Sequence, residues 1–279
     1  ILPAVGLALP MWLRNLLIYP GWDLLALRWH DLVVRGQATT ADWIAEYGTV
    51  AYLERAFGLT FRSFWGVFGW LSTAMDDRIY IAAQVFTGVL FLGLLWACLR
   101  LISGVPDTDM DTFQVTVLAI LAILLLAVVA SYLWYNIKFV QHQGRYFFWG
   151  MLAIGTVVAL GWREVLHPLQ GTITGLLGMA LAGSMLASLA IGDAVDKWTL
   201  LIVLVAATFL LVQPLLLVGT GIIHPWRPLN RLAPVFSRPA FARPLILLRF
   251  LAWATPFLLL FLLNWVVPTW YIVPQLGAP

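Results

Sequence analysis

The sequence predicts an all-α membrane protein, a polytopic bundle of about seven transmembrane helices with an extracytoplasmic amphipathic-helix segment. Hydrophobic residues make up 62% of its 279 residues and charged residues only 10%, whereas soluble domains carry about 25% charged residues. The mean hydropathy is +0.92. Apolar stretches near the roughly 20 residues that a transmembrane helix needs recur along the chain and are separated by short polar connections.

The first 78 residues predict one partial span and one long polar segment. Residues 1–17 read as a first, partial transmembrane helix, and because Ile1 already lies inside this apolar stretch we expect a processed or partial chain. Residues 18–78 form an amphipathic, interfacial segment. Its stretches WDLLALRWHDLVV and ADWIAEYGTVAYLERAF have apolar residues at helical spacing, which predicts helices lying on the membrane surface.

Residues 79–267 predict a bundle of six transmembrane helices, and residues 268–279 an uncharged C-terminal tail. The six helices are expected at Ile79–Ile102, Thr112–Tyr135, Tyr146–Trp162, Thr172–Ile191, Trp198–Ile223 and Leu245–Val267. The high density of Gly, Ala and Ser in the helix at 172–191 favours close helix–helix packing. Gln213-Pro214 predicts a kink in the helix that follows.

The charges predict an orientation and exclude one class of partner. The net charge is only +3 and the arginines are dispersed over the connections, so we expect no nucleic acid partner. Positive charge favours the cytoplasmic side, and six arginines lie in or beside the connections that follow the predicted helices ending at 102, 162 and 223: Arg100, Arg163, Arg227, Arg231, Arg238 and Arg243. The 18–78 segment, the 139–145 loop and the C-terminus are then expected on the outer face of a bacterial plasma (inner) membrane.

The sequence predicts neither a metal site nor a cofactor. The single cysteine, Cys98, excludes an internal disulfide and a cysteine cluster. The four histidines lie on different connections, without HxxH or HExxH spacing. We therefore expect no metal ion held by histidine or cysteine, and no cofactor, in this chain.

The loop between the second and third of the six predicted full spans, at residues 136–145, is the first candidate site. Basic and amide side chains gather there between aromatic residues, a combination that binds an anionic phosphate at a membrane surface. With one arginine of the 18–78 segment added, the predicted lipid-phosphate-binding residues are Arg62, Lys138, Gln143, Arg145 and Tyr146. The alternative is anchoring, in which Lys138 and Arg145 only extend towards the lipid head groups beside an aromatic belt.

The pair Asp76-Asp77 is the second candidate site, for an acid or a cation. Two carboxylates at the outer end of a span suit a general base or a divalent cation. The alternative is that the pair caps the incoming helix, because acidic residues stabilise a helix N-terminus.

Three stretches resemble bacterial GT-C-type membrane proteins related to the family 39 protein mannosyltransferases, a group largely of unknown function. They are WLRNLLIYPGWDLL at 12–25, FRSFWGVFGWLS at 61–72 and FVQHQGRYFFWGMLAI at 139–154. The resemblance covers roughly residues 10–165 and points to the C-terminal half of such a protein. It implies a glycosyltransferase that takes a sugar from a polyprenyl-phosphate carrier at the outer face.

Two functions lead at this point, and a transporter comes third because Gln213-Pro214 is the one sign of a broken helix. By the resemblance, the chain is the non-catalytic half of a lipid-linked sugar transferase that binds membrane lipids, among them a polyprenyl-phosphate sugar. No catalytic residue is identified in this chain, because the family's catalytic acid lies in an early outer loop that has no match here. The alternative is an accessory or structural subunit of a larger respiratory or photosynthetic membrane complex, with other membrane subunits as partners and no catalysis of its own.

Overall fold

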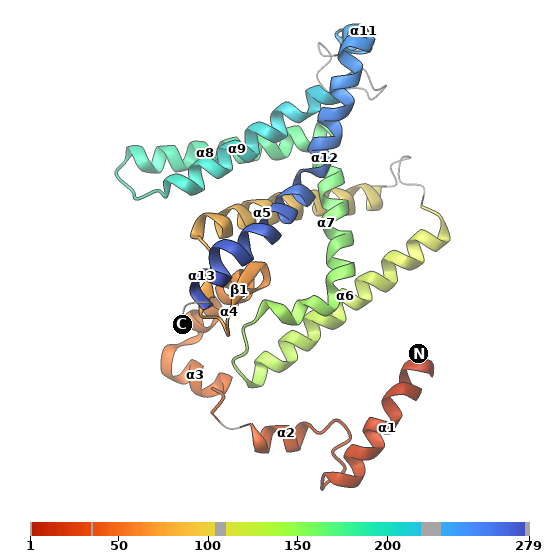
Figure 1. Ribbon diagram of the computed structural model, residues 1–279, viewed down its shortest axis with the longest axis vertical. Coiled ribbons are helices and arrows are strands. Elements are labelled where there is room, and N and C mark those ends of the chain that lie inside the picture. The colour runs from red at the N-terminus through yellow and green to blue at the C-terminus, as the bar shows by residue number, and fades with distance from the viewer. Residues whose placement is uncertain (1, 35, 104–109, 219–229, 277–279) are drawn as a thin grey trace. The chain divides into compact units, whose positions relative to one another are not determined.

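A computed structural model describes residues 2–34, 36–103, 110–218 and 230–276 (Figure 1). The predicted all-α class is confirmed, since most of the described chain is helical and its strands form one short two-stranded hairpin. Among the described residues, six helices are long and apolar enough to cross a membrane, and a shorter apolar helix covers Val5–Ile18. The chain is therefore an integral membrane protein.

The spanning helices match the six predicted between residues 79 and 267. They cover Asp77–Ser103, Thr112–Lys138, Gly144–Val165, Pro168–Ala190, Lys197–Leu217 and Pro239–Leu276. The last begins earlier than predicted and continues to Leu276, within the region expected to be a tail. Residues 219–223 of the predicted helix Trp198–Ile223, and the connections at 104–109 and 224–229, lie outside the described residues.

The chain divides into two compact units, and the first boundary between them along the sequence falls inside the 18–78 segment. The first unit comprises Ile1–Ala56 and Leu133–His142, and the second comprises Phe57–Tyr132 and Gln143–Pro279.

The first unit contains helices α1 (Leu2–Ile18), α2 (Leu27–Val33) and α3 (Thr40–Tyr47), with the start of α4 (Thr49–Gly66) and the end of α6 (Thr112–Lys138). Of the two predicted amphipathic stretches, the first is helical only at α2, because residues 22–26 lie in turns, whereas most of the second is helical. The second is divided into α3 and α4 by Gly48, whose φ of 87° lies in the left-handed region that favours glycine.

Asn136, in the last turn of α6, organises the first unit. The Thr40 and Tyr52 hydroxyls both donate to its carbonyl oxygen, at 2.7 and 2.8 Å. Its side chain accepts from the Gln141 backbone N–H at 2.9 Å and donates to the Gln141 carbonyl. These bonds fix the loop that follows α6, because they satisfy its buried backbone groups.

The second unit holds the membrane-spanning helices α5 (Asp77–Ser103), α7 (Met151–Val165), α8 (Pro168–Ala190) and α9 (Lys197–Val212). The hairpin of β1 (Val67–Phe68) and β2 (Thr73–Ala74) precedes α5, and the 3₁₀ segment η2 (Gly144–Gly150) precedes α7. The C-terminal part contains α11 (Ala233–Phe236), α12 (Pro239–Val267), the π-helical η4 (Pro268–Ile272) and α13 (Val273–Leu276).

Glycines let the helices of the second unit pack closely. A Cβ added to Gly93 of α5 would lie 2.1 Å from the Gly161 carbonyl oxygen of α7, so these two backbones are in direct contact. α8 and α9 form a hairpin (Figure 1) in which Gly175 and Gly178 pack against α9. Gly175 and Gly178 of α8 therefore serve close packing, as predicted, whereas Gly183 has open space beside it.

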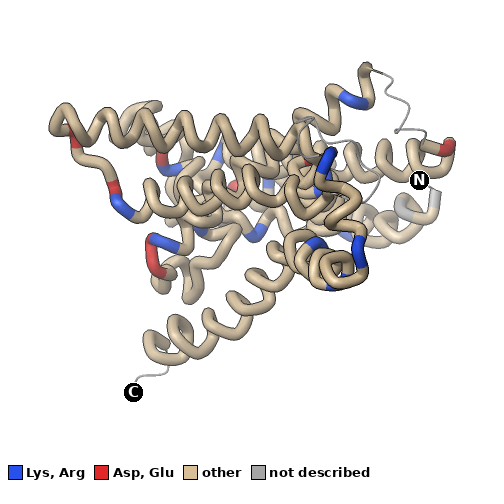
Figure 2. Tube along the Cα trace, turned by 90° about the horizontal axis from the view of Figure 1, so that it is seen from above, with Lys and Arg blue, Asp and Glu red and all other residues tan. Residues whose placement is uncertain are grey.

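The predicted kink is a break in the helix. α9 ends at Val212, and the chain continues as the 3₁₀ segment η3 (Gln213–Leu217). Pro214 lacks the backbone N–H that an α-helix would require there. Most charged residues lie near helix ends and connections, leaving long uncharged runs between them (Figure 2).

Candidate functional site

The start of η2 and helix α4 meet at Gly144. The Gly144 backbone N–H donates to Ser63 Oγ of α4 at 2.7 Å. A Cβ at Gly144 would lie 2.2 Å from the Phe64 backbone nitrogen, so only glycine permits this approach. Arg145 follows directly in sequence. The predicted site residues that belong to the second unit lie at this same end of its helices.

Arg62 and Asp77 form an ion pair at this end. Arg62 Nη2 donates to Asp77 Oδ1 at 2.5 Å, and the guanidinium lies 4.3 Å from the centre of the Tyr80 ring. Both side chains are exposed, which limits such a pair to about 0–1 kcal/mol. The positive charge of Arg62 is nevertheless matched by a carboxylate within the chain.

Asp76 acts as a helix cap. Its Oδ1 accepts from the Arg78 backbone N–H at 2.9 Å, and its carboxylate also pairs with the Arg78 guanidinium at 2.6 Å. These hydrogen bonds lower the pKa of Asp76 to about 2, so the group is ionised at neutral pH. The Arg78 guanidinium lies 4.9 Å from the Trp198 ring centre, which brings the start of α9 to the same end.

Arg145 is the predicted cation that differs from the others. It is exposed, and its guanidinium lies 5.4 Å from the Trp70 ring centre and 5.7 Å from the Tyr146 ring centre. Neither contact neutralises its charge, and among the described residues no carboxylate forms an ion pair with it. The half-buried Gln143 precedes it, and the Gln143 carbonyl accepts from the Tyr146 backbone N–H at 3.3 Å.

Trp70 stands at the tip of the β1–β2 hairpin in an unusual conformation. Trp70 and Leu71 have backbone φ angles of 57° and 69°, which residues other than glycine rarely adopt. Such backbone strain costs about 1–3 kcal/mol per residue and persists only where surrounding contacts enforce it. The Tyr80 hydroxyl closes the base of the hairpin by donating to the Gly66 carbonyl at 2.6 Å and accepting from the Met75 N–H at 3.0 Å.

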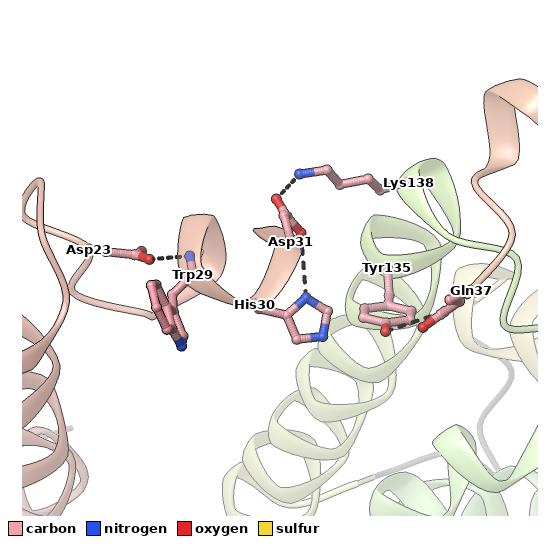
Figure 3. A network of polar contacts seen from close by, with 7 residues as sticks. All are labelled: Asp23, Trp29, His30, Asp31, Gln37, Tyr135 and Lys138. Carbon is pink, nitrogen blue, oxygen red and sulfur yellow. Dashed lines mark hydrogen bonds and ion pairs between the residues drawn. The ribbon is translucent and has the colours of Figure 1, made fainter. Parts of the chain in front are cut away.

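Lys138 belongs to the first unit and is engaged there. Figure 3 shows its ammonium group beside the carboxylate of Asp31, with which it forms an ion pair. The same carboxylate contacts His30 Nδ1 at 3.4 Å. Gln37 donates to the Tyr135 hydroxyl in the same network. The charge of Lys138 is therefore also matched within the chain.

His142 is a buried group that the sequence did not single out. Only 2% of its surface is exposed, and neither ring nitrogen has a hydrogen-bond partner among the described residues. Burial, and secondarily the charge of Arg55, lowers its pKa to about 4. The Tyr52 ring packs edge-on against it, with 4.8 Å between centres.

A second polar group, also unforeseen, lies at the other end of the second unit. Arg100 of α5 donates to both carboxylate oxygens of Glu164 in α7 at 3.1 Å, and both side chains are largely buried. Gln213 donates to the Leu166 carbonyl at 3.0 Å across the helix break. A glutamate at the end of an apolar helix is the signal that could have identified this pair.

Two further observations bear on ligand chemistry. No group of three or more His, Cys, Asp or Glu that could hold a metal ion occurs among the described residues.

A depression of about 550 Å³, open to its surroundings, lies at the turn between α8 and α9. Its polar lining includes Ser184, Ser188, Asp193, Asp196 and Thr199. Asp196 is engaged as the cap of α9, since its Oδ2 accepts from the Thr199 N–H at 2.8 Å.

Comparison with known proteins gives no relative. No protein-family model matches the chain, and neither the curated proteins nor the solved structures contain a match to it. The resemblance to GT-C-type glycosyltransferases therefore stays a prediction from the sequence motifs.

Proposed function

We propose that this integral membrane protein binds the phosphate of a membrane lipid through Arg145, and that a polyprenyl-phosphate sugar is the lipid concerned. The observation that carries the proposal is the pairing of the predicted cations. Arg62 pairs with Asp77 and Lys138 with Asp31, whereas no carboxylate pairs with Arg145 among the described residues. An exposed guanidinium offers a phosphate several donors in a fixed plane.

The surroundings of Arg145 support this role. Gly144 and Ser63 hold the start of η2 against α4, so the position of Arg145 does not depend on a loose loop. Trp70 provides an exposed indole beside the guanidinium, and tryptophan favours the head-group region of a bilayer. The two acids at this end are paired with Arg62 and Arg78, which reduces their repulsion of an anion.

The test compares a phosphorylated lipid with its alcohol. Native mass spectrometry of the detergent-purified chain should retain a short-chain polyprenyl phosphate and release the matching polyprenol. Arg145→Ala should reduce retention of the phosphate, whereas Arg163→Ala, which removes an exposed arginine from the far end of α7, should leave it unchanged. Equal retention of the phosphate and the alcohol would reject the proposal.

We also propose that the Arg145 end of the second unit faces the outside of a bacterial plasma membrane, as the charge bias of the connections suggests. In a Cys98→Ser background, Ser72→Cys at the hairpin tip should react with a membrane-impermeant maleimide added to intact cells. Arg163→Cys in the same background should react only after the cells are permeabilised. The reverse pattern would place the Arg145 end in the cytoplasm.

A second function, as an accessory subunit of a larger respiratory or photosynthetic membrane complex, is favoured by one observation. The apolar surface of α6 is largely exposed, at Phe113, Ile120, Ile123 and Leu126 among others, and suits a partner helix as well as lipid. If the chain is such a subunit, then after extraction from its native membrane in mild detergent it should migrate on a native gel in a complex with redox subunits. Migration as an isolated chain would exclude it.

A further inference from the structure

Two buried polar atoms on α8 have no hydrogen-bond partner among the described residues. They are Gln170 Oε1 and Thr174 Oγ1, on side chains whose residues are only 7% and 3% exposed. A third unpartnered atom is His167 Nδ1. The spacing i, i+4 places Gln170 and Thr174 on one face of α8, and His167 is the N-cap residue directly before the helix.

This face of α8 lies beside the break between α9 and η3. A Cβ at Gly171, one residue after Gln170, would lie 2.4 Å from the Val165 carbonyl oxygen and 2.7 Å from Gln213 Nε2. The first turns of α8 are therefore pressed against the end of α7 and the start of η3. Polar atoms left without a partner in such a place are destabilising, so an occupant that restores their hydrogen bonds stabilises the protein.

The chemistry of the unpartnered atoms defines the occupant. A carboxamide oxygen needs a donor, which excludes a simple anion. The charged side chains at this end include Arg100, which is paired with Glu164, and Arg249, which donates to the Leu216 and Val218 carbonyls. With the exposed Arg163 of the last turn of α7, arginines outnumber the one glutamate among these described residues, and this positive balance disfavours a cation. A neutral molecule that both donates and accepts remains.

We propose that a bound water molecule bridges Gln170 Oε1 and Thr174 Oγ1 at the start of α8. Side chains four residues apart on a helix lie about 5–6 Å apart at their Cβ atoms, a separation that one water can span. Two to four polar partners are typical of a buried water, and these two atoms supply two. If the amide of Gln170 is turned over, the water accepts from Nε2 instead.

The sign of a stability change tests the proposal. Thr174→Val keeps the shape of the side chain and removes the hydroxyl. If the hydroxyl binds water, the melting temperature of the detergent-purified protein should fall by about 2–4 °C, as for one lost hydrogen bond. If the hydroxyl has no partner at all, its removal should raise the melting temperature. Thr156→Val on the exposed face of α7 provides the baseline for the same exchange.

The shared water predicts coupling between the two residues. Gln170→Met should also lower the melting temperature, and the double variant should fall by less than the sum of the single changes, because both lose the same water. Additive losses, or an unchanged or higher melting temperature in Thr174→Val, would overturn the proposal. A melting temperature that rises when sodium chloride replaces choline chloride would instead indicate a cation and would equally overturn it.

Discussion

Replacement of Gly144 tests the contact that positions Arg145. In Gly144→Ala the new methyl group would lie 2.2 Å from the Phe64 backbone nitrogen and 2.3 Å from its Cα. Backbone atoms cannot rotate away as a side chain can, so η2 must move from α4 and the hydrogen bond to Ser63 is strained or lost. Overpacking of this kind costs about 1–3 kcal/mol and occasionally more.

Gly155→Ala is the matched control, because it makes the same exchange on α7 with no heavy atom within 4 Å of the added Cβ. There the alanine should stabilise the helix by about 0.5–1 kcal/mol. Thermal unfolding of both variants, followed by intrinsic fluorescence in one detergent, should therefore give melting temperatures that change in opposite directions. If Gly144→Ala is as stable as Gly155→Ala, the close approach of η2 to α4 is refuted.

Three further predictions concern the other polar groups. The folded-state pKa of His142 is lowered to about 4 from an ordinary value of 6.5, so protonation favours the unfolded state. Stability should fall as the pH drops from about 6.5 to 4, and thermal melts of His142→Phe should show a weaker pH dependence in that window. Glu164→Leu leaves Arg100 buried without its partner and should destabilise the protein by about 3–5 kcal/mol in thermal melts. Adding Arg100→Met should recover much of that loss, and a larger loss in the double variant would contradict the buried pair. Tyr80→Phe removes a hydroxyl that serves two backbone groups, so it should cost about 1–3 kcal/mol and increase hydrogen exchange in the 67–75 hairpin. Unchanged exchange there would show that the hydroxyl does not close the hairpin.

The membrane-spanning helices could be predicted because their signal is local. Apolar runs of sufficient length define α5 to α9 and α12, and Gln213-Pro214 marks the break without any tertiary information. The capping role of Asp76 was likewise one of the two readings open from sequence, since it depends on residues only two positions apart.

The charge pairs could not be predicted, because they depend on the tertiary fold. Lys138 meets Asp31 across 107 positions of sequence, and Arg62 meets Asp77 across 15. The sequence did not distinguish between three candidates for the phosphate-binding cation, namely Arg62, Lys138 and Arg145. The fold separates them by pairing the first two with carboxylates. The β1–β2 hairpin was also missed, since its strands have two residues each and its turn uses left-handed residues other than glycine.

The affinity of the purified protein for a short-chain polyprenyl phosphate tests the central claim most directly. A hydrogen bond to a charged group contributes about 1.5–3 kcal/mol, and the exposure of Arg145 favours the lower value. Since 1.4 kcal/mol corresponds to a factor of ten, Arg145→Ala should raise the dissociation constant about tenfold. Arg163→Ala should leave it unchanged. A dissociation constant in Arg145→Ala equal to that of the unaltered protein would contradict the assignment of Arg145 as the phosphate-binding residue.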